Sequence, residues 1–121
     1  MHDRIEKGRD VSAADYIDML RARASLVQAF RTRLAGLDGL VLPTTPIVAP
    51  TIAEMSAPDA AAKNLLLLRN PALVNFFDLC AISLPLPREG GLPVGLMLVA
   101  RNGEDRKLFR MAAAVERLFA A

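Results

Sequence analysis

Few residues of this sequence belong to the types that commonly attack or deprotonate a substrate. The chain of 121 residues has four serines and three lysines, which could supply a serine nucleophile and its base. None of them forms a recognisable catalytic motif with another. The single histidine, His2, excludes a histidine-centred triad and a multi-histidine metal site within one chain. We therefore predict no catalytic residue and no metal site. The serines are Ser12, Ser25, Ser56 and Ser83, and the lysines are Lys7, Lys63 and Lys107.

Structural roles explain the candidate nucleophiles better than catalytic roles do. Ser12 stands where a helix N-cap is expected, Ser25 lies within the same helix, and Ser83 is a small residue inside an apolar strand. Cys80 begins that strand, where burial raises the pKa of a thiol and makes it inert. The glycines of residues 91–95 lack the lysine and the strand-then-helix order of a phosphate-binding loop.

The composition indicates one modest domain, residues 1–121. Such a chain can bury roughly two thirds of its extended surface around a single core. Hydrophobic residues make up 53% and aromatic residues only 5%, so the core must be aliphatic. The formal net charge of +2 is too small to indicate a polyanionic partner. We expect no nucleic-acid partner, because four arginines of the first helix point in separate directions instead of forming one basic stripe. They are Arg21, Arg23, Arg31 and Arg33.

One cysteine cannot form an internal disulfide, and the chain opens with no signal-peptide pattern. We therefore expect a cytoplasmic protein. The longest apolar runs, residues 65–68 and 92–100, are far shorter than the ~20 residues that cross a bilayer. No transmembrane helix and no membrane partner are expected.

Apolar periodicity predicts two long helices. Between residues 12 and 36, apolar side chains recur at alternating three- and four-residue steps, which is typical of one helical stripe. Ser12 and Asp15 match a capping box at its start, and Gly36 predicts a left-handed stop at its end. The second long helix is expected from Asn102, its cap, to the end of the chain.

Shorter elements are expected between these two helices. Asn70 and Pro71 read as a cap followed by a proline at the first helical position, which predicts about two helical turns as far as Asp78. Residues 65–68 add one or two turns before it. Residues 43–62, rich in proline, threonine and alanine, predict an extended loop with at most one short turn.

Three short segments, residues 40–42, 81–84 and 94–99, are apolar on both faces, as in a sheet covered by helices on both sides. The connection between the last two segments is too short for a crossover helix, so it predicts an antiparallel hairpin. Gly95 lies inside an apolar strand, which indicates close approach of a backbone or a helix. The expected fold class is α/β.

Several of these segments resemble the last third of an amidase-signature hydrolase. The resemblance starts near residues 4–8, includes residues 13–16 and residues 38–46 (DGLVLPTTP), and continues from Asn75 through residues 91–100 (GLPVGLMLVA). It covers nearly the whole chain. It implies a fragment of the family's α/β/α fold, with a mixed sheet and covering helices. Cys80 stands where many members have proline, and Asp78 stands where a glycine is common.

The resemblance implies an activity for a longer protein. Members cleave amide bonds with a serine nucleophile, a second serine and a lysine, all in an upstream Gly/Ser-rich stretch that these residues do not contain, and no cofactor is implied. We therefore predict the C-terminal lobe of an amidase, whose partner is the N-terminal catalytic portion. Thr44, Asn75 and Asp78 lie in loops or at element ends and are predicted to border the substrate pocket.

The alternative is an autonomous, non-catalytic module for oligomerisation or interaction. Strands taken from a larger sheet leave an unpaired edge and uncovered apolar surface. We expect a homo-oligomer of the isolated chain, as a two-fold dimer that uses the sheet edge or the helix of residues 12–36. In the opposite outcome, residues 43–62 and the N-terminal residues fold back over this surface and keep the chain monomeric.

Overall fold

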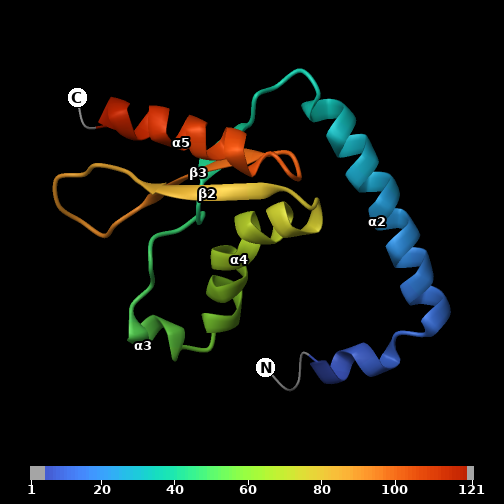
Figure 1. Cartoon of the computed structure of the whole chain (residues 1–121). Coiled ribbons are helices and arrows are strands. Elements are labelled where there is room, and N and C mark those ends of the chain that lie inside the picture. Colours follow the sequence, from blue (N-terminus) through green and yellow to red (C-terminus); the bar gives the residue numbers. More distant parts are fainter. Residues whose placement is uncertain (1–4, 120–121) are drawn as a thin grey trace.

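A three-stranded antiparallel sheet forms the centre of the structure, a computed structural model that describes residues 5–119 (Figure 1). Its strands are β1 (Leu40–Pro43), β2 (Cys80–Pro85) and β3 (Gly95–Ala100), in the order β1-β3-β2. The register pairs Leu40 of β1 and Ala81 of β2 with Val99 of β3. The three predicted strands and the antiparallel hairpin between β2 and β3 are confirmed.

Helices cover both faces of the sheet, as the strands apolar on both faces predicted (Figure 1). α5 (Asp105–Phe119) packs on one face, where it forms an aliphatic cluster with β2 and β3. α4 (Ala60–Phe76) packs on the other face against β3. The α/β class is thereby confirmed, with the sheet between two helical layers. The buried residues of the first cluster are Leu84, Leu98, Ala100, Leu108 and Ala112, and those of the second are Val74, Met97 and Val99.

α5 begins later than the sequence predicted. Asn102 was expected as its cap, but the helix starts at Asp105. The chain first has to reverse direction after β3, and it does so through a turn in which Gly103 has a φ of 78°, in the left-handed region. The N–H of Leu108 donates to the carbonyl of Glu104 at 2.9 Å, so the first helical turn closes on Glu104.

α2 (Ala13–Leu34) confirms the long N-terminal helix and its cap. Ser12 Oγ accepts a hydrogen bond from the N–H of Asp15 at 3.1 Å. The predicted left-handed stop at Gly36 is wrong, because the helix ends at Leu34 and the C-cap, Ala35, is right-handed. Along these 22 residues only Val27 and Leu34 are buried, and α2 stands to one side of the sheet (Figure 1).

The two short helices expected around Asn70 are one helix, α4, of 17 residues. Pro71 lies inside it, and Asn70 is not a cap. An interior proline removes one backbone hydrogen bond and bends a helix, and Figure 1 shows α4 changing direction along its length. Leucine and alanine, which favour helices, fill the preceding turns, and the packing of Val74 on the sheet holds the last turns in helical form.

Two short helical segments complete the structure, η1 (Lys7–Asp10) before α2 and α3 (Ile52–Met55) in the loop between β1 and α4. The single turn expected in this loop is therefore confirmed. α3 starts with a complete capping box: Thr51 Oγ1 accepts from the N–H of Glu54, and the Glu54 carboxylate accepts from the N–H of Thr51 at 2.8 Å. Lys63 Nζ lies 3.2 Å from the other oxygen of Glu54, which ties α3 to α4.

The capping box predicts an unusually low pKa for the Glu54 carboxyl. The hydrogen bonds from Thr51 and the neighbouring Lys63 lower the pKa of Glu54 from 4.5 to about 2. Because the folded-state pKa is lowered, the contribution of this carboxylate to stability is present above the unfolded pKa and is lost as the pH falls towards 2. We expect an NMR titration of the Glu54 carboxyl to give a midpoint near 2, and Thr51→Ala to raise it. A midpoint of 4.5 in both proteins would contradict the capping box.

Candidate functional site

Two hydroxyl groups meet over the middle strand at one end of the sheet. Thr44 follows β1, and its N–H donates to the carbonyl of Gly95 at 2.9 Å. Thr44 Oγ1 lies 2.5 Å from the Oγ of Ser83 in β2, and either atom can donate in this hydrogen bond. Since β3 separates β1 from β2, the bond joins two strands that do not pair with each other. We refer to it as the hydroxyl bridge between Thr44 and Ser83.

The missing side chain at Gly95 makes room for the hydroxyl bridge. A Cβ at this position would lie 2.5 Å from Thr44 Oγ1 and closer still to Ser83 Oγ, nearer than real Cβ atoms come to other atoms. The close approach expected at Gly95 is confirmed. Its neighbours, however, are two side chains and not a backbone or a helix, because the hydroxyls reach across β3 at this point.

A buried amide fixes the segment that leads into Thr44. Asn70 of α4 is only 7% exposed, and its Nδ2 donates to the carbonyl of Pro43 at 2.7 Å. A buried polar group that loses its partner costs about 1–3 kcal/mol, so this contact holds the end of β1 against α4. The sequence interpretation of Asn70 as a cap missed this role. The available signal was its position one turn before Val74, on the apolar side of the helix.

Asp78 occupies the turn between α4 and β2, at the other end of the sheet. Its φ of 52° lies in the left-handed region, which glycine adopts freely and aspartate tolerates better than most residues. The same conformation explains why a glycine suits this position in the sequences that the chain resembles. The Asp78 carboxylate accepts a hydrogen bond from Arg23 Nη2 at 2.6 Å, and both side chains are partly buried.

Arg23 and three aromatic rings attach α2 to this turn. The guanidinium carbon of Arg23 lies 5.7 Å from the centre of the Phe76 ring. Phe30 of α2 stacks on Phe77, with ring centroids 4.2 Å apart and an interplanar angle of 17°. Arg23 therefore helps to attach α2 to the rest of the structure. Its partners lie more than 50 residues away in the sequence, so the helical period of α2 alone did not reveal them.

The predicted pocket residues do not come together. β2 runs from Cys80, which pairs with Ala100, to Pro85, which pairs with Gly95. Asn75 and Asp78 precede the first end of β2, whereas Thr44 lies beside Gly95 at the other end. Asn75 is exposed, and its carbonyl accepts a hydrogen bond from the N–H of Asp78 at 3.3 Å. The sheet thus separates Thr44 from Asn75 and Asp78, and the pocket role of all three stays a prediction.

Every serine hydroxyl of the chain has a structural partner. Ser12 caps α2, Ser25 and Ser56 donate to backbone carbonyls one helical turn earlier, and Ser83 shares the hydroxyl bridge. Lys63 contacts two carboxylates, and Lys107 contacts Asp38. Within residues 5–119 no hydrogen bond joins a serine to a lysine. The described residues therefore form no serine–lysine pair of the kind that activates a nucleophile.

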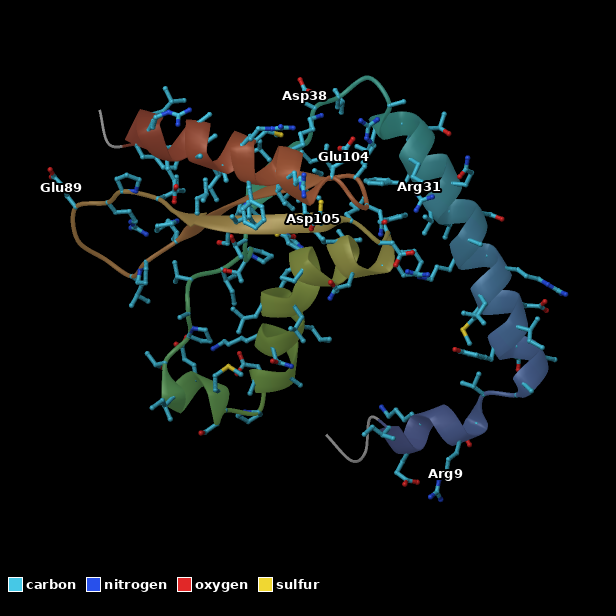
Figure 2. The ribbon with its side chains drawn as sticks, in the orientation of Figure 1. Arg9, Arg31, Asp38, Glu89, Glu104 and Asp105 are labelled. Atoms are coloured by element: carbon cyan, nitrogen blue, oxygen red, sulfur yellow. The ribbon has the colours of Figure 1, made fainter. Side chains whose placement is uncertain are left out.

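The carboxylates near the start of α5 form separate ion pairs. Asp38 lies 2.9 Å from Lys107, and Glu104 lies 2.6 Å from Arg101; each cation lowers the pKa of its partner. Figure 2 shows Glu89 in the loop between β2 and β3, at the far end of the sheet from Asp38 and Glu104. Asp38, Glu89 and Glu104 therefore do not form the adjacent pair that acid-base catalysis by two carboxylates needs.

Cys80 is an unreactive thiol, as the sequence predicted. Its Sγ donates to the carbonyl of Arg101 at 3.2 Å, and burial raises the pKa of the thiol. A raised pKa keeps the sulfur protonated at neutral pH, and a protonated thiol is a poor nucleophile.

An apolar hollow of about 450 Å³ lies beside Gly95, between β1, the loop that follows β1 and the start of β3. Aliphatic side chains, prolines and Thr45 line it, the Thr45 hydroxyl donates to the carbonyl of Ile47, and no ionisable side chain lines the hollow. A specific small-molecule site needs a few convergent polar groups as well as apolar walls. The hollow by itself therefore accounts for an apolar wall and not for a reaction.

Among residues 5–119, no three or more histidine, cysteine, aspartate or glutamate side chains are grouped so as to bind a metal ion. Over the same residues, no helix combines the length and the apolar character that crossing a bilayer requires.

Comparison with known proteins adds sequence and structural relatives. A sequence profile described as Amidase matches residues 1–109. The chain is 31% identical to the 2-amino-5-chloromuconic acid deaminase of Comamonas testosteroni, over 98% of this chain and 26% of that protein. It is 37% identical to a Glutamyl-tRNA(Gln) amidotransferase subunit of Thermus thermophilus, over 93% of this chain and 24% of that protein. A crystal structure of an amidase superposes with a TM-score of 0.76 at 25% identity, over 97% of this chain and 28% of that chain.

The covered sheet and these matches define a fragment of an amidase-type α/β fold. The chain belongs to the Amidase family, which confirms the resemblance seen in the sequence. It spans about a quarter of the length of the curated relatives that it matches.

The short distances around Gly95 predict that a larger side chain at this position destabilises the fold. Gly95→Val places atoms where the two hydroxyls of the bridge now lie, so we expect the free energy of unfolding to fall by about 1–3 kcal/mol. Gly36→Ala is the matched control, because a Cβ at Gly36 meets no atom within 4 Å. Thermal unfolding of the two variants and the parent checks this. A Gly95→Val protein as stable as the parent would show that the hydroxyl bridge does not form in solution.

Proposed function

We propose that the chain is the C-terminal lobe of an amide-bond hydrolase, where it supplies supporting sheet and part of the wall of the substrate pocket. The observation that carries the proposal is the extent of the matches: nearly all of this chain corresponds to about a quarter of each longer relative. The names of the two relatives, one a deaminase and the other part of an amidotransferase, share a reaction at a carbon–nitrogen bond. They differ in substrate, so they support the reaction class and no particular amide.

The proposal assigns catalysis to a portion of the protein outside these residues. A serine nucleophile needs a base to activate it and donors to stabilise the oxyanion, and the serine hydroxyls of this chain already have structural partners. In the longer protein, the resemblance implies that an upstream serine attacks the amide carbonyl, an acyl-enzyme forms, and water releases the acid.

Thr44 is the best supported of the three predicted wall residues. Its chain neighbours Pro43 and Thr45 line the apolar hollow beside Gly95, and Asn70 and Ser83 fix the position of Thr44. Asn75 and Asp78 lie at the opposite end of the sheet, so one small substrate cannot touch all three. We assign Thr44 to the pocket wall and Asp78 to the attachment of α2.

The first prediction from this proposal is that the chain alone hydrolyses no amide. We expect ammonia release from simple aliphatic and aryl amides to stay at buffer background, because no serine of residues 5–119 is hydrogen-bonded to a lysine. A sensitive enzymatic ammonia assay on the purified chain measures this. Turnover that disappears on Ser83→Ala, and survives Ser25→Ala, would overturn the assignment of catalysis to another portion.

The length of the native gene product tests whether this chain is one lobe of a longer protein. Antibodies against this chain should detect a polypeptide about four times as long in its source cells, since the chain matches 26% of a relative. The coding sequence should then continue in frame upstream into a Gly/Ser-rich stretch. We propose a cytoplasmic location for that protein. Detection of a product of 121 residues alone would favour the autonomous module.

We also propose that the isolated chain forms a dimer through the sheet edge. β1 and β2 are the outer strands of the three-stranded sheet, so each keeps one unpaired edge, and such edges recruit other strands. Light scattering coupled to gel filtration should give a dimer mass, and Val41→Lys, which places a charge on the exposed β1, should shift it towards the monomer. A parent chain that stays monomeric at high micromolar concentration contradicts this prediction.

A further inference from the structure

α4 carries an apolar groove of about 480 Å³ on the side away from the sheet. Its lining residues recur at three- and four-residue steps, so they share one side of the helix, roughly opposite to the buried Asn70 and Val74. Leu65 and Leu73 are 59% and 51% exposed. A continuous exposed patch of large apolar side chains marks an interaction site. The α4 groove consists of Leu65, Leu68, Arg69, Ala72, Leu73 and Phe76.

α2 presents a second apolar face without a cover. At about 100° per residue, Tyr16, Met19 and Leu20 lie on the same side of α2 as Arg23 and Phe30, which attach the helix to the turn at Asp78. The three apolar side chains are exposed, Tyr16 to 56%. A hollow of about 540 Å³ continues this face at the junction of η1 and α2.

The two faces come close to each other at one end. The guanidinium of Arg23 lies over the ring of Phe76, so the C-terminal end of the α4 groove is next to the point where α2 touches the turn. From there the two helices diverge towards their N-terminal ends (Figure 1). Tyr16 of α2 and Leu65 of α4 are both exposed, so neither face covers the other.

A solved relative indicates what covers the two faces. A long helix gains most of its stability from packing of its apolar face, and the first half of α2 lacks such packing here. The whole arrangement nevertheless superposes on an amidase crystal structure over 97% of this chain, which makes up only 28% of that chain. Most of that protein therefore lies outside the superposed part. We propose that the α4 groove and the apolar face of α2 bind a helix from that remaining portion of the amidase fold, an inference that rests on the proposed function.

The charge on the α4 groove indicates a further property of the helix that binds there. Arg69 makes no ion pair with any carboxylate of residues 5–119, and its Nε only approaches Asn70 Oδ1, at 3.5 Å. The other groove residues are apolar. The occupant therefore presents an aliphatic or aromatic helix face to Leu65, Leu73 and Tyr16, together with one carboxylate that meets Arg69.

The test compares the isolated chain with a full-length chimera. In the chimera, this chain replaces the matching quarter of the Comamonas testosteroni deaminase. Hydrogen exchange monitored by mass spectrometry reports on residues 13–22 and on the groove residues, since exchange slows when a surface is covered. We expect exchange of residues 13–22 to be at least about tenfold slower in the chimera than in the isolated chain.

Two matched variants show whether the groove itself is covered. Leu65→Glu changes an exposed leucine of the groove, and Leu118→Glu changes an exposed leucine of α5. In the isolated chain both should unfold at the temperature of the parent. In the chimera, only Leu65→Glu should lower the unfolding temperature and restore fast exchange in residues 13–22.

The remaining outcomes separate this inference from the proposed function. Exchange of residues 13–22 that is as slow in the isolated chain as in the chimera, whether from a second copy or from contact between α2 and α4, overturns the inference. A folded chimera with deaminase activity and fast exchange overturns it as well, while the proposed function stands. A protected but inactive chimera supports the inference and contradicts the proposed function. A chimera that stays unfolded, although the isolated chain folds, contradicts both.

Discussion

The structure depends on the burial of β3 on all sides. It is the middle strand of the sheet, and four successive residues, 97–100, are buried because α5 covers one face and α4 the other. Burying one large aliphatic side chain contributes about 1.5–3 kcal/mol, so this strand fixes the positions of the elements around it. Its register places Thr44 beside Gly95, and its end determines where the turn into α5 must begin.

The sequence analysis predicted the elements that patterns among neighbouring residues determine. The strands, the hairpin and the two long helices follow from apolar runs and from periods of three to four residues. The prediction failed where tertiary packing overrides a local stop signal: α4 continues through Pro71 because Val74 packs on the sheet. It also missed Asn70 and Arg23, whose partners are 27 and 55 residues away. One sequence holds no local pattern for contacts across such distances.

The candidate site is built from neutral polar groups. Thr44, Ser83 and Asn70 bond to one another or to the backbone, so their hydroxyls and amide hold a shape and transfer no proton. The charged side chains, in contrast, form ion pairs at the start of α5 and around α3. Such a division is compatible with the pocket-wall role that we propose, in which the reacting groups belong to another portion of the protein.

The left-handed turn at Asp78 has a consequence for how this sequence can change. A glycine there would relax the backbone, but it would remove the carboxylate and leave Arg23 beside Phe76 without its counter-ion. A neutral residue at position 23 would in turn leave Asp78 with an unfavourable backbone conformation and no compensating bond. Substitutions at the two positions are therefore interdependent. Among descendants of this gene, aspartate with arginine and glycine with a neutral residue are the combinations that selection should retain.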